Sequence, residues 1–209
     1  MRDGCPVAGC GKNGLTARTP SGLSPPVGGR TEVGIQAEEG ELLKNRIEVS
    51  EMQLADLDAV LEIEVHSFPT PWSRRAFWSE LTQNIYAHYI VARLDGVIVG
   101  YGGMWVILDE AHVTNIAVHP EYRRLGIGKR VLVDLMERAR SRSATRMTLE
   151  VRKSNSAAQS LYEQMGFVAK GIRKGYYSDL KEDAIIMWKD DLCKQKNPWY
   201  RVPWFGVGR

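Results

Sequence analysis

The spacing of apolar residues divides the chain into three parts. Between residues 46 and 192, apolar residues recur with the periods of helices and strands. Residues 1–45 are rich in Gly, Pro, Ser and Thr and show neither period, so we expect a disordered arm. Residues 193–209 form an aromatic, proline-punctuated tail that cannot be one long helix; it either packs on the domain or serves as a docking peptide. The pattern therefore predicts one domain, over residues 46–192.

Helical periodicity predicts four helices in this domain. The first is marked by apolar residues at intervals of three and four, namely Leu54, Leu57, Leu61 and Val65. Ser73 can cap the second helix, which runs through Leu81. The third and longest carries an apolar face of Ile127, Val131, Leu132, Leu135, Met136 and Ala139. The last runs from about Ser156 to Met165, with Gly166 where a left-handed cap residue is wanted.

Alternating and continuous apolar runs predict strands between these helices. They cover residues 46–51, 86–93, 97–108, 111–118, 145–151, 168–176 and 183–189. Asp95-Gly96 is a hairpin turn signal between the second and third strands. The order is βααβββαβαββ, which indicates the α/β class, with a mixed sheet covered by helices.

The composition excludes several classes of protein. With 44% hydrophobic and 25% charged residues, the chain has material for a globular core. No apolar run reaches the 18 or so residues that span a bilayer, and the first residues lack the apolar stretch of a secretory signal. We therefore expect a cytoplasmic protein with no membrane contact. The three cysteines, Cys5, Cys10 and Cys193, have no further Cys or His pair at zinc-ligand spacing, so no metal is expected.

The formal net charge of +3 is too small to indicate a nucleic-acid partner by itself. Basic residues nevertheless crowd one stretch that contains few acids: Arg123, Arg124, Lys129, Arg130, Arg138, Arg140, Arg142 and Arg146. A patch of this kind suits an anionic partner, either a phosphate-bearing cofactor or RNA.

A glycine-containing segment, Arg123-Arg124-Leu125-Gly126-Ile127-Gly128, joins the strand over 111–118 to the longest helix. Free N–H groups at a helix start, with the helix dipole, form an anion site, and glycines let the backbone approach a diphosphate. A dinucleotide-binding fingerprint needs a third glycine where Val131 stands. A Walker loop needs Ser or Thr where Arg130 stands, so both of these nucleotide motifs are excluded.

The segment Arg123-x-x-Gly126-x-Gly128 resembles the pyrophosphate loop of the GCN5-related N-acetyltransferase (GNAT) superfamily, whose fold is a mixed, mostly antiparallel sheet flanked by helices. The flanking segments are similar to the bacterial ribosomal-protein-alanine N-acetyltransferases of the RimI type. They are Asn115 to Pro120, Leu149 to Ala158, Leu161 to Phe167, Tyr176-Tyr177 and Glu182 to Met187. The similarity covers about Ile47 to Trp188, with several motifs in the same order.

The resemblance implies acetyl-CoA as the co-substrate. Its diphosphate would be held by the backbone amides of Leu125, Gly126, Ile127, Gly128 and Lys129, beside Arg123 and Arg124. The pantetheine arm would pair with the strand at Ile116, Ala117 and Val118, where the N–H of Ile116 or Val118 would hold the thioester carbonyl. Asn155, a helix N-cap candidate, would contact the CoA.

The resemblance also implies two catalytic residues. Glu150 would be the general base; otherwise it is a surface carboxylate beside Arg152. Tyr162, two helical turns after Asn155, would protonate the departing CoA thiolate, and its ring can at the same time pack in the core. Transfer would be direct within a ternary complex, so no covalent enzyme intermediate is implied.

The acceptor expected from the resemblance is the amino terminus of a protein, specifically the N-terminal alanine of a small-subunit ribosomal protein. The Pro71-Trp72 and Tyr176-Tyr177 pairs would flank the acceptor groove, although either pair could be plain core. Two alternatives stay open: an acetyltransferase of the same fold acting on a small amine or an internal lysine, and a ribosome- or RNA-binding module with a vestigial acetyl-CoA site. We expect nucleic acid contact only through the ribosome, and a monomer.

Overall fold

The computed structural model describes residues 46–192. The predicted arm over 1–45, the tail over 193–209, and all three cysteines lie outside the described residues. The elements follow the order β1 (Ile47–Glu51), η1 (Leu54–Asp56), α2 (Leu57–Ser67), α3 (Arg74–Thr82), β2 (Ala87–Leu94), β3 (Val97–Ile107), β4 (Glu110–Val118), η2 (Pro120–Tyr122), α4 (Ile127–Ser141), β5 (Arg146–Arg152), α5 (Ser156–Gln164), β6 (Val168–Tyr177) and β7 (Glu182–Lys189). Two short 3₁₀ turns aside, this is the predicted order.

The strands of the described region form one seven-stranded sheet in the order β1-β2-β3-β4-β5-β7-β6. Every neighbouring pair is antiparallel except β4 and β5, which run parallel. The parallel pair needs a crossover, and α4 supplies it. The predicted α/β class with a mixed, mostly antiparallel sheet is therefore confirmed.

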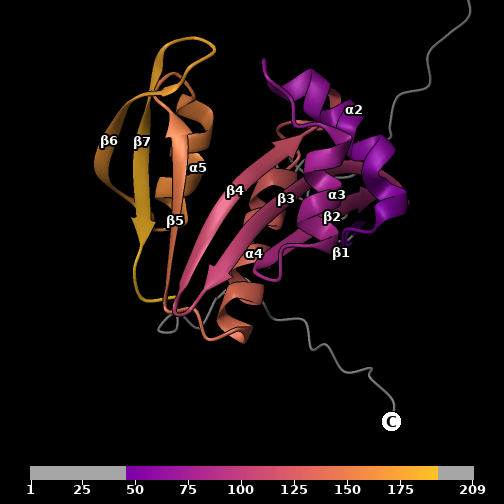
Figure 1. Ribbon diagram of the computed structural model, residues 1–209, viewed down its shortest axis with the longest axis horizontal. Helices are drawn as coiled ribbons and strands as arrows, with labels where there is room; N and C mark the ends of the chain where they lie inside the picture. The colour runs from indigo at the N-terminus through magenta and orange to yellow at the C-terminus, as the bar shows by residue number, and fades with distance from the viewer. Residues whose placement is uncertain (1–45, 193–209) are drawn as a thin grey trace, which may run out of the picture.

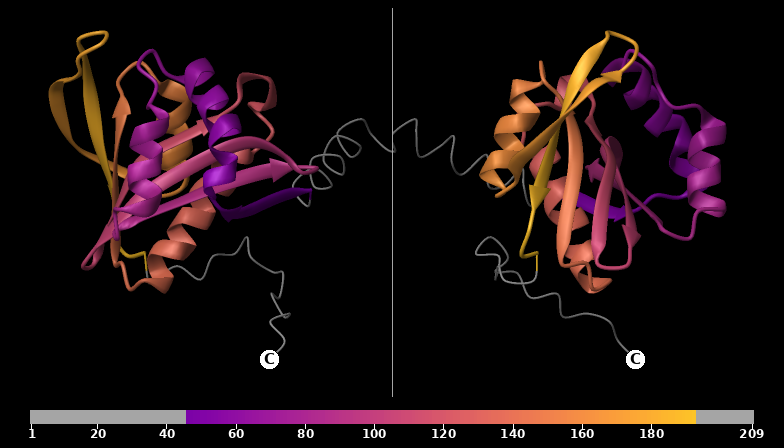
Figure 2. Two further views of the ribbon diagram at one scale, coloured as in Figure 1. Left: turned by 45° about the vertical axis from the view of Figure 1, so that its right-hand side comes forward. Right: turned by 60° about the vertical axis from the view of Figure 1, so that its left-hand side comes forward.

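Helices cover both faces of the sheet and bury two apolar cores. On one face α4 packs against β1 to β4, and the predicted apolar side of α4 is buried from Ile127 to Ala139. On the other face α2 and α3 enclose a second core around Phe77 and Tyr101. Figures 1 and 2 show α2 and α3 together on one side and α4 on the other.

The predicted capping residues lie where the sequence indicated. Ser73 Oγ accepts a hydrogen bond from the Ala76 N–H at the start of α3, and Asn155 Oδ1 accepts one from the Ala158 N–H at the start of α5. Gly166, with φ +85°, closes α5 in the left-handed conformation. These local signals needed no tertiary information.

The buried face of the first helix matches the prediction only in part. Leu54 and Val65 are 46% and 65% exposed, whereas α2 buries Leu57, Val60, Ile63 and Glu64. Leu57 is buried as predicted and Leu61 packs against the core around Phe77, while a carboxylate, Glu64, occupies one of the inward positions.

Several arginines of the basic stretch have acidic or carbonyl partners within the domain. Arg138 pairs with Asp134 and Glu51, Arg140 bonds to Glu137 and the Leu192 carbonyl, and Arg146 pairs with Glu110. Their charges are engaged along α4 and beyond its C-terminal end. Arg138 and Arg140 lie in the last third of α4, about two turns or more beyond its first turn.

Two further observations bear on the class of protein. No helix within residues 46–192 is long and apolar enough to cross a membrane. In that same part of the chain, no three His, Cys, Asp or Glu side chains are gathered in a way that could hold a metal ion.

Gly102 in β3 lets α4 approach the sheet closely. A Cβ at this position would lie 2.6 Å from Val131 Cγ1 and 3.1 Å from Leu135 Cδ1. We expect Gly102→Ala to lower the free energy of unfolding by about 1–3 kcal/mol through overpacking, measured by urea denaturation. Gly171→Ala is the control, since a Cβ there meets only Ile186 Cδ1 at 3.6 Å. Equal stability of the two variants would contradict this packing account.

Candidate active site

The site begins where β4 and β5 part. They pair only from Glu110 to Val113 on β4 and from Arg146 to Leu149 on β5, although both strands continue further. An extra residue, Thr114, bulges β4 at that point, since Val113 faces Met104 and Asn115 faces Gly103. The two strands therefore diverge toward their C-terminal ends (Figure 1).

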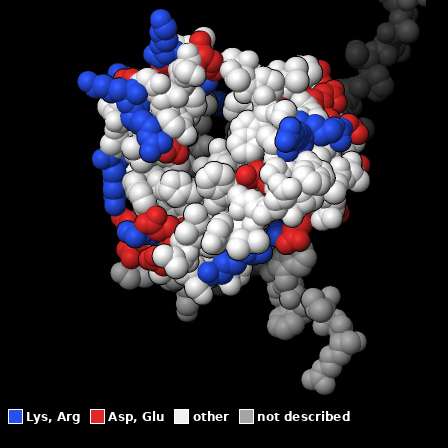
Figure 3. All heavy atoms as spheres, in the orientation of Figure 1, with Lys and Arg blue, Asp and Glu red and all other residues white. Residues whose placement is uncertain are grey.

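A cavity of about 410 Å³ fills the gap between the strands. Its walls come from α2 and the following loop, β4, β5, α5 and the end of β6 with the loop after it. The residues that line it are Glu64, Ser67, Phe68, Thr70, Trp72, Val113, Thr114, Asn115, Ile116, Leu149, Glu150, Val151, Arg152, Asn155, Tyr162, Tyr176, Tyr177, Ser178 and Asp179. Figure 3 shows the surface hollowed between the α2–α3 side and the β5–β7 side.

The β4 edge carries unpaired backbone N–H groups into this gap. The His119 N–H donates to the Val99 carbonyl on the β3 side, at 2.9 Å. Successive N–H groups alternate between the two edges of a strand, so those of Val118 and Ile116 point away from β3 and toward the gap. Ala117 faces β3 instead, and its side chain is buried in the α2–α3 core. The geometry therefore favours Ile116 and Val118 over Ala117 as the residues that offer backbone donors.

Glu150 lies on β5 with its side chain only 13% exposed. Its Oε1 is 3.2 Å from Nη1 of Arg173 on β6, and its backbone carbonyl accepts a hydrogen bond from the Tyr177 hydroxyl at 3.3 Å. Glu150 is thus a partly buried, charge-paired carboxylate in the cavity wall and not a free surface group.

Tyr162 reaches the same cavity from α5. The residue is 9% exposed, and its ring lies 5.9 Å from that of Phe167, so it is packed as well as cavity-lining. Burial, and to a smaller extent the neighbouring Tyr177, raises the pKa of Tyr162 to about 12. Its hydroxyl therefore holds its proton across the physiological pH range and can act only as a donor of that proton.

Aromatic side chains form opposite walls of the cavity mouth. Trp72 lines it from the α2–α3 side, and its ring packs 5.4 Å from Phe77, so this residue belongs to both wall and core. Tyr176, which is 45% exposed, and Tyr177 stand 5.0 Å apart on the β6 side. Pro71 is exposed and does not line the cavity.

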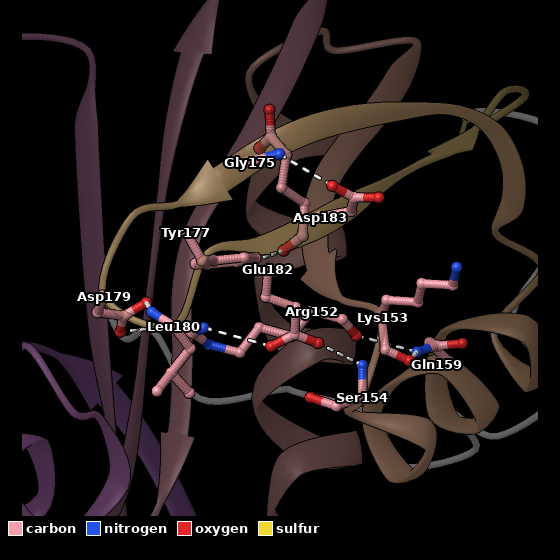
Figure 4. Close-up of polar contacts among 11 residues, drawn as sticks. Arg152, Lys153, Ser154, Gln159, Gly175, Tyr177, Asp179, Leu180, Glu182 and Asp183 are labelled. Atoms are coloured by element: carbon pink, nitrogen blue, oxygen red, sulfur yellow. Dashed lines mark hydrogen bonds and ion pairs between the residues drawn. The ribbon is translucent and has the colours of Figure 1, made fainter.

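Arg152 fastens the β6–β7 loop to β5 (Figure 4). Its guanidinium stacks 3.9 Å from the centre of the Tyr177 ring, with Nη2 2.6 Å from Asp179 Oδ2 and Nη1 3.4 Å from Glu182 Oε2. Glu182 also accepts the Ser154 N–H at 2.6 Å. These contacts fix the wall that carries Tyr176 and Tyr177.

The start of α4 lies beyond the open end of β4 and outside the cavity. Gly126 is the N-cap with φ +82°, a conformation that a side chain would strain, and the first N–H groups of the helix, from Ile127 to Lys129, face outward from it. Arg123 does not point freely into solvent, because its Nε donates to the Val118 carbonyl at 3.1 Å. Arg123 thus links the loop to β4 by this hydrogen bond, and both Arg123 and Arg124 are exposed.

Sequence reasoning missed several residues of the site. Arg173 pairs with Glu150 from a distant strand, and Thr114 and Asn115 line the cavity through a bulge that no local pattern shows. Glu64 is 1% exposed on an inward position of α2. The sequence did contain a signal for Glu64. It lies three positions after Leu61 and four after Val60, so it places a carboxylate on an otherwise apolar helical face.

Comparison with known proteins agrees with this geometry. Residues 57–167 match the acetyltransferase (GNAT) family, and the chain belongs to it. It is similar to a Bacillus subtilis protein named for alanine N-acetylation of ribosomal protein bS18, with 46% identity over 146 residues, 70% of this chain and 97% of that protein. The Escherichia coli K12 [ribosomal protein bS18]-alanine N-acetyltransferase is 38% identical over 141 residues, 66% of this chain and 94% of that protein. The crystal structure of the Escherichia coli ribosomal-protein-S18-alanine N-acetyltransferase superposes with a TM-score of 0.65 and 35% identity, covering 74% of this chain and 99% of that one.

Removing the Arg152 guanidinium should loosen the Tyr176–Tyr177 wall. We expect Arg152→Ala to raise amide hydrogen exchange across residues 177–182 by roughly tenfold, equivalent to about 1.4 kcal/mol of local opening, as measured by mass spectrometry. Arg146→Ala is the matched control, because Arg146 also forms an ion pair and lies over an aromatic ring, but at the paired end of β4 and β5. Unchanged exchange in Arg152→Ala would show that the loop is held by other contacts.

Proposed function

We propose that this acetyltransferase carries the acetyl group of acetyl-CoA to the α-amine of a protein N-terminus, with the N-terminal alanine of ribosomal protein bS18 as the first candidate acceptor. The observation that carries the proposal is the convergence of Glu150, Tyr162 and Ile116 of the free β4 edge on one cavity between parted strands. The relatives named for this reaction support the choice of acceptor.

The described residues fit an acetyl-CoA molecule. The N–H groups of Ile127 and Gly128 at the start of α4 suit a diphosphate, and a Cβ added at Gly126 would meet nothing within 4 Å, so the approach to that turn is open. The free β4 edge suits the amide-containing pantetheine arm. When bound, the thioester supplies an activated acetyl group, whose carbonyl oxygen the N–H of Ile116 or Val118 can polarise.

Glu150 would accept a proton from the incoming amine, directly or through one water. The task is modest, because an α-amine with a pKa of about 7.7–8.0 is already neutral for roughly a tenth of the time at pH 7. A lysine side chain, with a pKa of about 10.4, is neutral less than about a thousandth of the time at the same pH. The site is therefore suited to a chain terminus better than to a lysine. Arg173 would hold the carboxylate in place.

Tyr162 would return a proton to the sulfur as the thiolate leaves. A phenol with its pKa raised to about 12 is a weak acid toward a thiolate whose parent thiol has a pKa of about 8.5 in water. The burial that raises the pKa of the phenol also disfavours the thiolate, which narrows the difference. Transfer concerted with departure of the sulfur then needs no free thiolate.

A peptide panel tests the proposed function. CoA-thiol release is followed with peptides that begin with Ala, Ser, Met or Gly, and with a lysine peptide whose N-terminus is blocked. Turnover should occur on free termini, and Glu150→Gln should lower kcat/KM by about 100-fold or more. Turnover on the blocked lysine peptide alone would overturn N-terminal specificity. Acetyl-CoA binding without turnover on any peptide or on intact bS18 would favour a binding module.

Tyr162→Phe separates the proton donor from a packed ring. The ring contact with Phe167 stays, so the melting temperature should stay within about 2–4 °C, while kcat falls by about 100-fold and KM for acetyl-CoA changes little. Thermal unfolding measures the melting temperature, and steady-state kinetics measure kcat and KM. A variant with full kcat would assign Tyr162 to packing alone.

A further inference from the structure

Glu64 has an environment that the proposed reaction does not explain. It is 1% exposed in the middle of α2, yet its carboxylate lines the cavity on the wall that lies across from β5. Within residues 46–192 no Lys, Arg or His forms an ion pair with it. An ionised carboxylate buried without a cation normally destabilises a fold, so stability alone gives no reason for its presence.

Two donors converge on this carboxylate from different parts of the chain. Oε2 accepts the backbone N–H of Trp72 at 2.6 Å, and Oε1 accepts the hydroxyl of Tyr101 on β3. The first bond holds the loop that carries the Trp72 wall. The second begins a network, because the Tyr101 hydroxyl in turn accepts from Asn115 Nδ2 at 3.1 Å.

That network ends at the β4 bulge. The Thr114 hydroxyl is 3.0 Å from Asn115 Oδ1 and 3.2 Å from the Tyr89 hydroxyl. Thr114 and Asn115 are the residues at which β4 leaves β5, and both line the cavity. One carboxylate therefore connects the acceptor wall on α2–α3 with the backbone from which the thioester site is built.

We propose that Glu64 is a positioning residue of the acceptor site, whose ionised carboxylate ties the Trp72 wall to the bulge of β4, and whose protonation releases that wall and weakens binding of the acceptor peptide. The inference rests on the proposed function insofar as the groove is taken to hold a peptide terminus. It goes beyond that function by assigning a residue that fixes groove geometry without contacting the reacting atoms.

The chemistry of the two donors explains why a carboxylate is needed. The Trp72 N–H and the Tyr101 hydroxyl both point at Glu64. Only the ionised carboxylate can accept from both donors at once, because the protonated carboxyl would turn a proton of its own toward one of them. Burial, opposed by the Trp72 N–H, raises the pKa of Glu64 to about 7. The carboxylate is thus half ionised near neutral pH, and the wall is held on the alkaline side of that midpoint.

Few other titratable groups face Glu64. Tyr101 approaches from β3 and donates its hydroxyl proton to Glu64. Tyr89 approaches from β2, and burial, first among several causes, raises its pKa, so Tyr89 is neutral in the relevant range. Asn115 from β4 does not titrate. On α2 itself the exposed His66 bonds to the Glu62 carbonyl and stacks 5.5 Å from His119. Across the cavity stand Glu150, the phenols of Tyr176 and Tyr177, and the Arg152–Asp179 pair.

The test compares Glu64→Gln with Glu62→Gln, the same change two positions away on the exposed face of α2. Glutamine keeps the shape of Glu64 but turns an N–H₂ group toward one of the two donors. Acceptor KM is measured with the Ala peptide, and acceptor Kd with its N-acetylated, C-terminally amidated product in the presence of CoA. The product peptide is chosen without ionisable side chains, so that any pH dependence of its Kd belongs to the enzyme.

Glu64→Gln should raise acceptor KM and product Kd by roughly tenfold or more at pH 8, the range for a lost charge-assisted hydrogen bond, and change KM for acetyl-CoA less than about twofold. In the wild type and in Glu62→Gln, product Kd should rise as pH falls through 7, and in Glu64→Gln it should be flat. Tyr101→Phe removes one donor to the ionised form, so its midpoint should move to higher pH.

Stability gives a readout that separates this role from a structural one. A carboxyl whose folded pKa is raised stabilises the fold below its unfolded pKa, near 4.5, and loses that contribution as pH rises through about 7. The melting temperature of Glu64→Gln should therefore vary less between pH 5 and 8 than that of the wild type, while acceptor binding is weaker. If Glu64 had a purely structural role, Glu64→Gln would lower the melting temperature and weaken the binding of both acetyl-CoA and the acceptor.

Hydrogen exchange makes the proposal independent of any acceptor. The Trp72 amide should exchange at least several-fold faster in Glu64→Gln than in Glu62→Gln at pH 8, whichever peptides the enzyme accepts. Equal exchange in the two variants, or a product Kd with the same pH dependence in both, would overturn the role of Glu64. If the wild type acetylated no peptide but the Trp72 amide still exchanged faster in Glu64→Gln, the proposed acceptor would be wrong. The link between Glu64 and Trp72 would still be supported.

Discussion

The early end of hydrogen bonding between β4 and β5 is the constraint on which the site depends. Two parallel strands that stayed paired to their ends would leave no cavity and no free backbone edge. The bulge at Thr114 lengthens β4 by one residue against β3 and lets it turn away from Leu149 on β5. Because β4 runs toward the open end, the α4 crossover also begins there, which brings a helix N-terminus and a free strand edge to the same end of the sheet.

Local signals in the sequence were sufficient for the order of the elements. The caps at Ser73, Asn155 and Gly166 and the apolar face of α4 depend on neighbours within one or two helical turns, and each was predicted correctly. The roles of Glu150 and Tyr162 came from resemblance to a family. The structure adds that both line one cavity, which periodicity cannot show because their elements meet only in three dimensions.

What the sequence could not show is which charges have partners distant in the chain. Arg138 and Arg140 looked like parts of a basic patch until Glu51 and the Leu192 carbonyl were found beside them. The alternative interpretation of Glu150 was a surface carboxylate beside Arg152, because the two residues are close in sequence. In the structure Arg152 instead contacts Asp179, Glu182 and the Tyr177 ring. A sequence shows which residues carry charge, but the fold decides which charges remain available to a ligand.

The final described residue is anchored at the end of the sheet away from the cavity. The Leu192 N–H donates to the Thr145 carbonyl, and its own carbonyl accepts from Arg140 Nε at 2.5 Å, beside the turn where β5 begins. Leu192 is itself fully buried. The end at which the described domain is tied down and the end at which its cavity opens are therefore opposite ends of the same strand, β5.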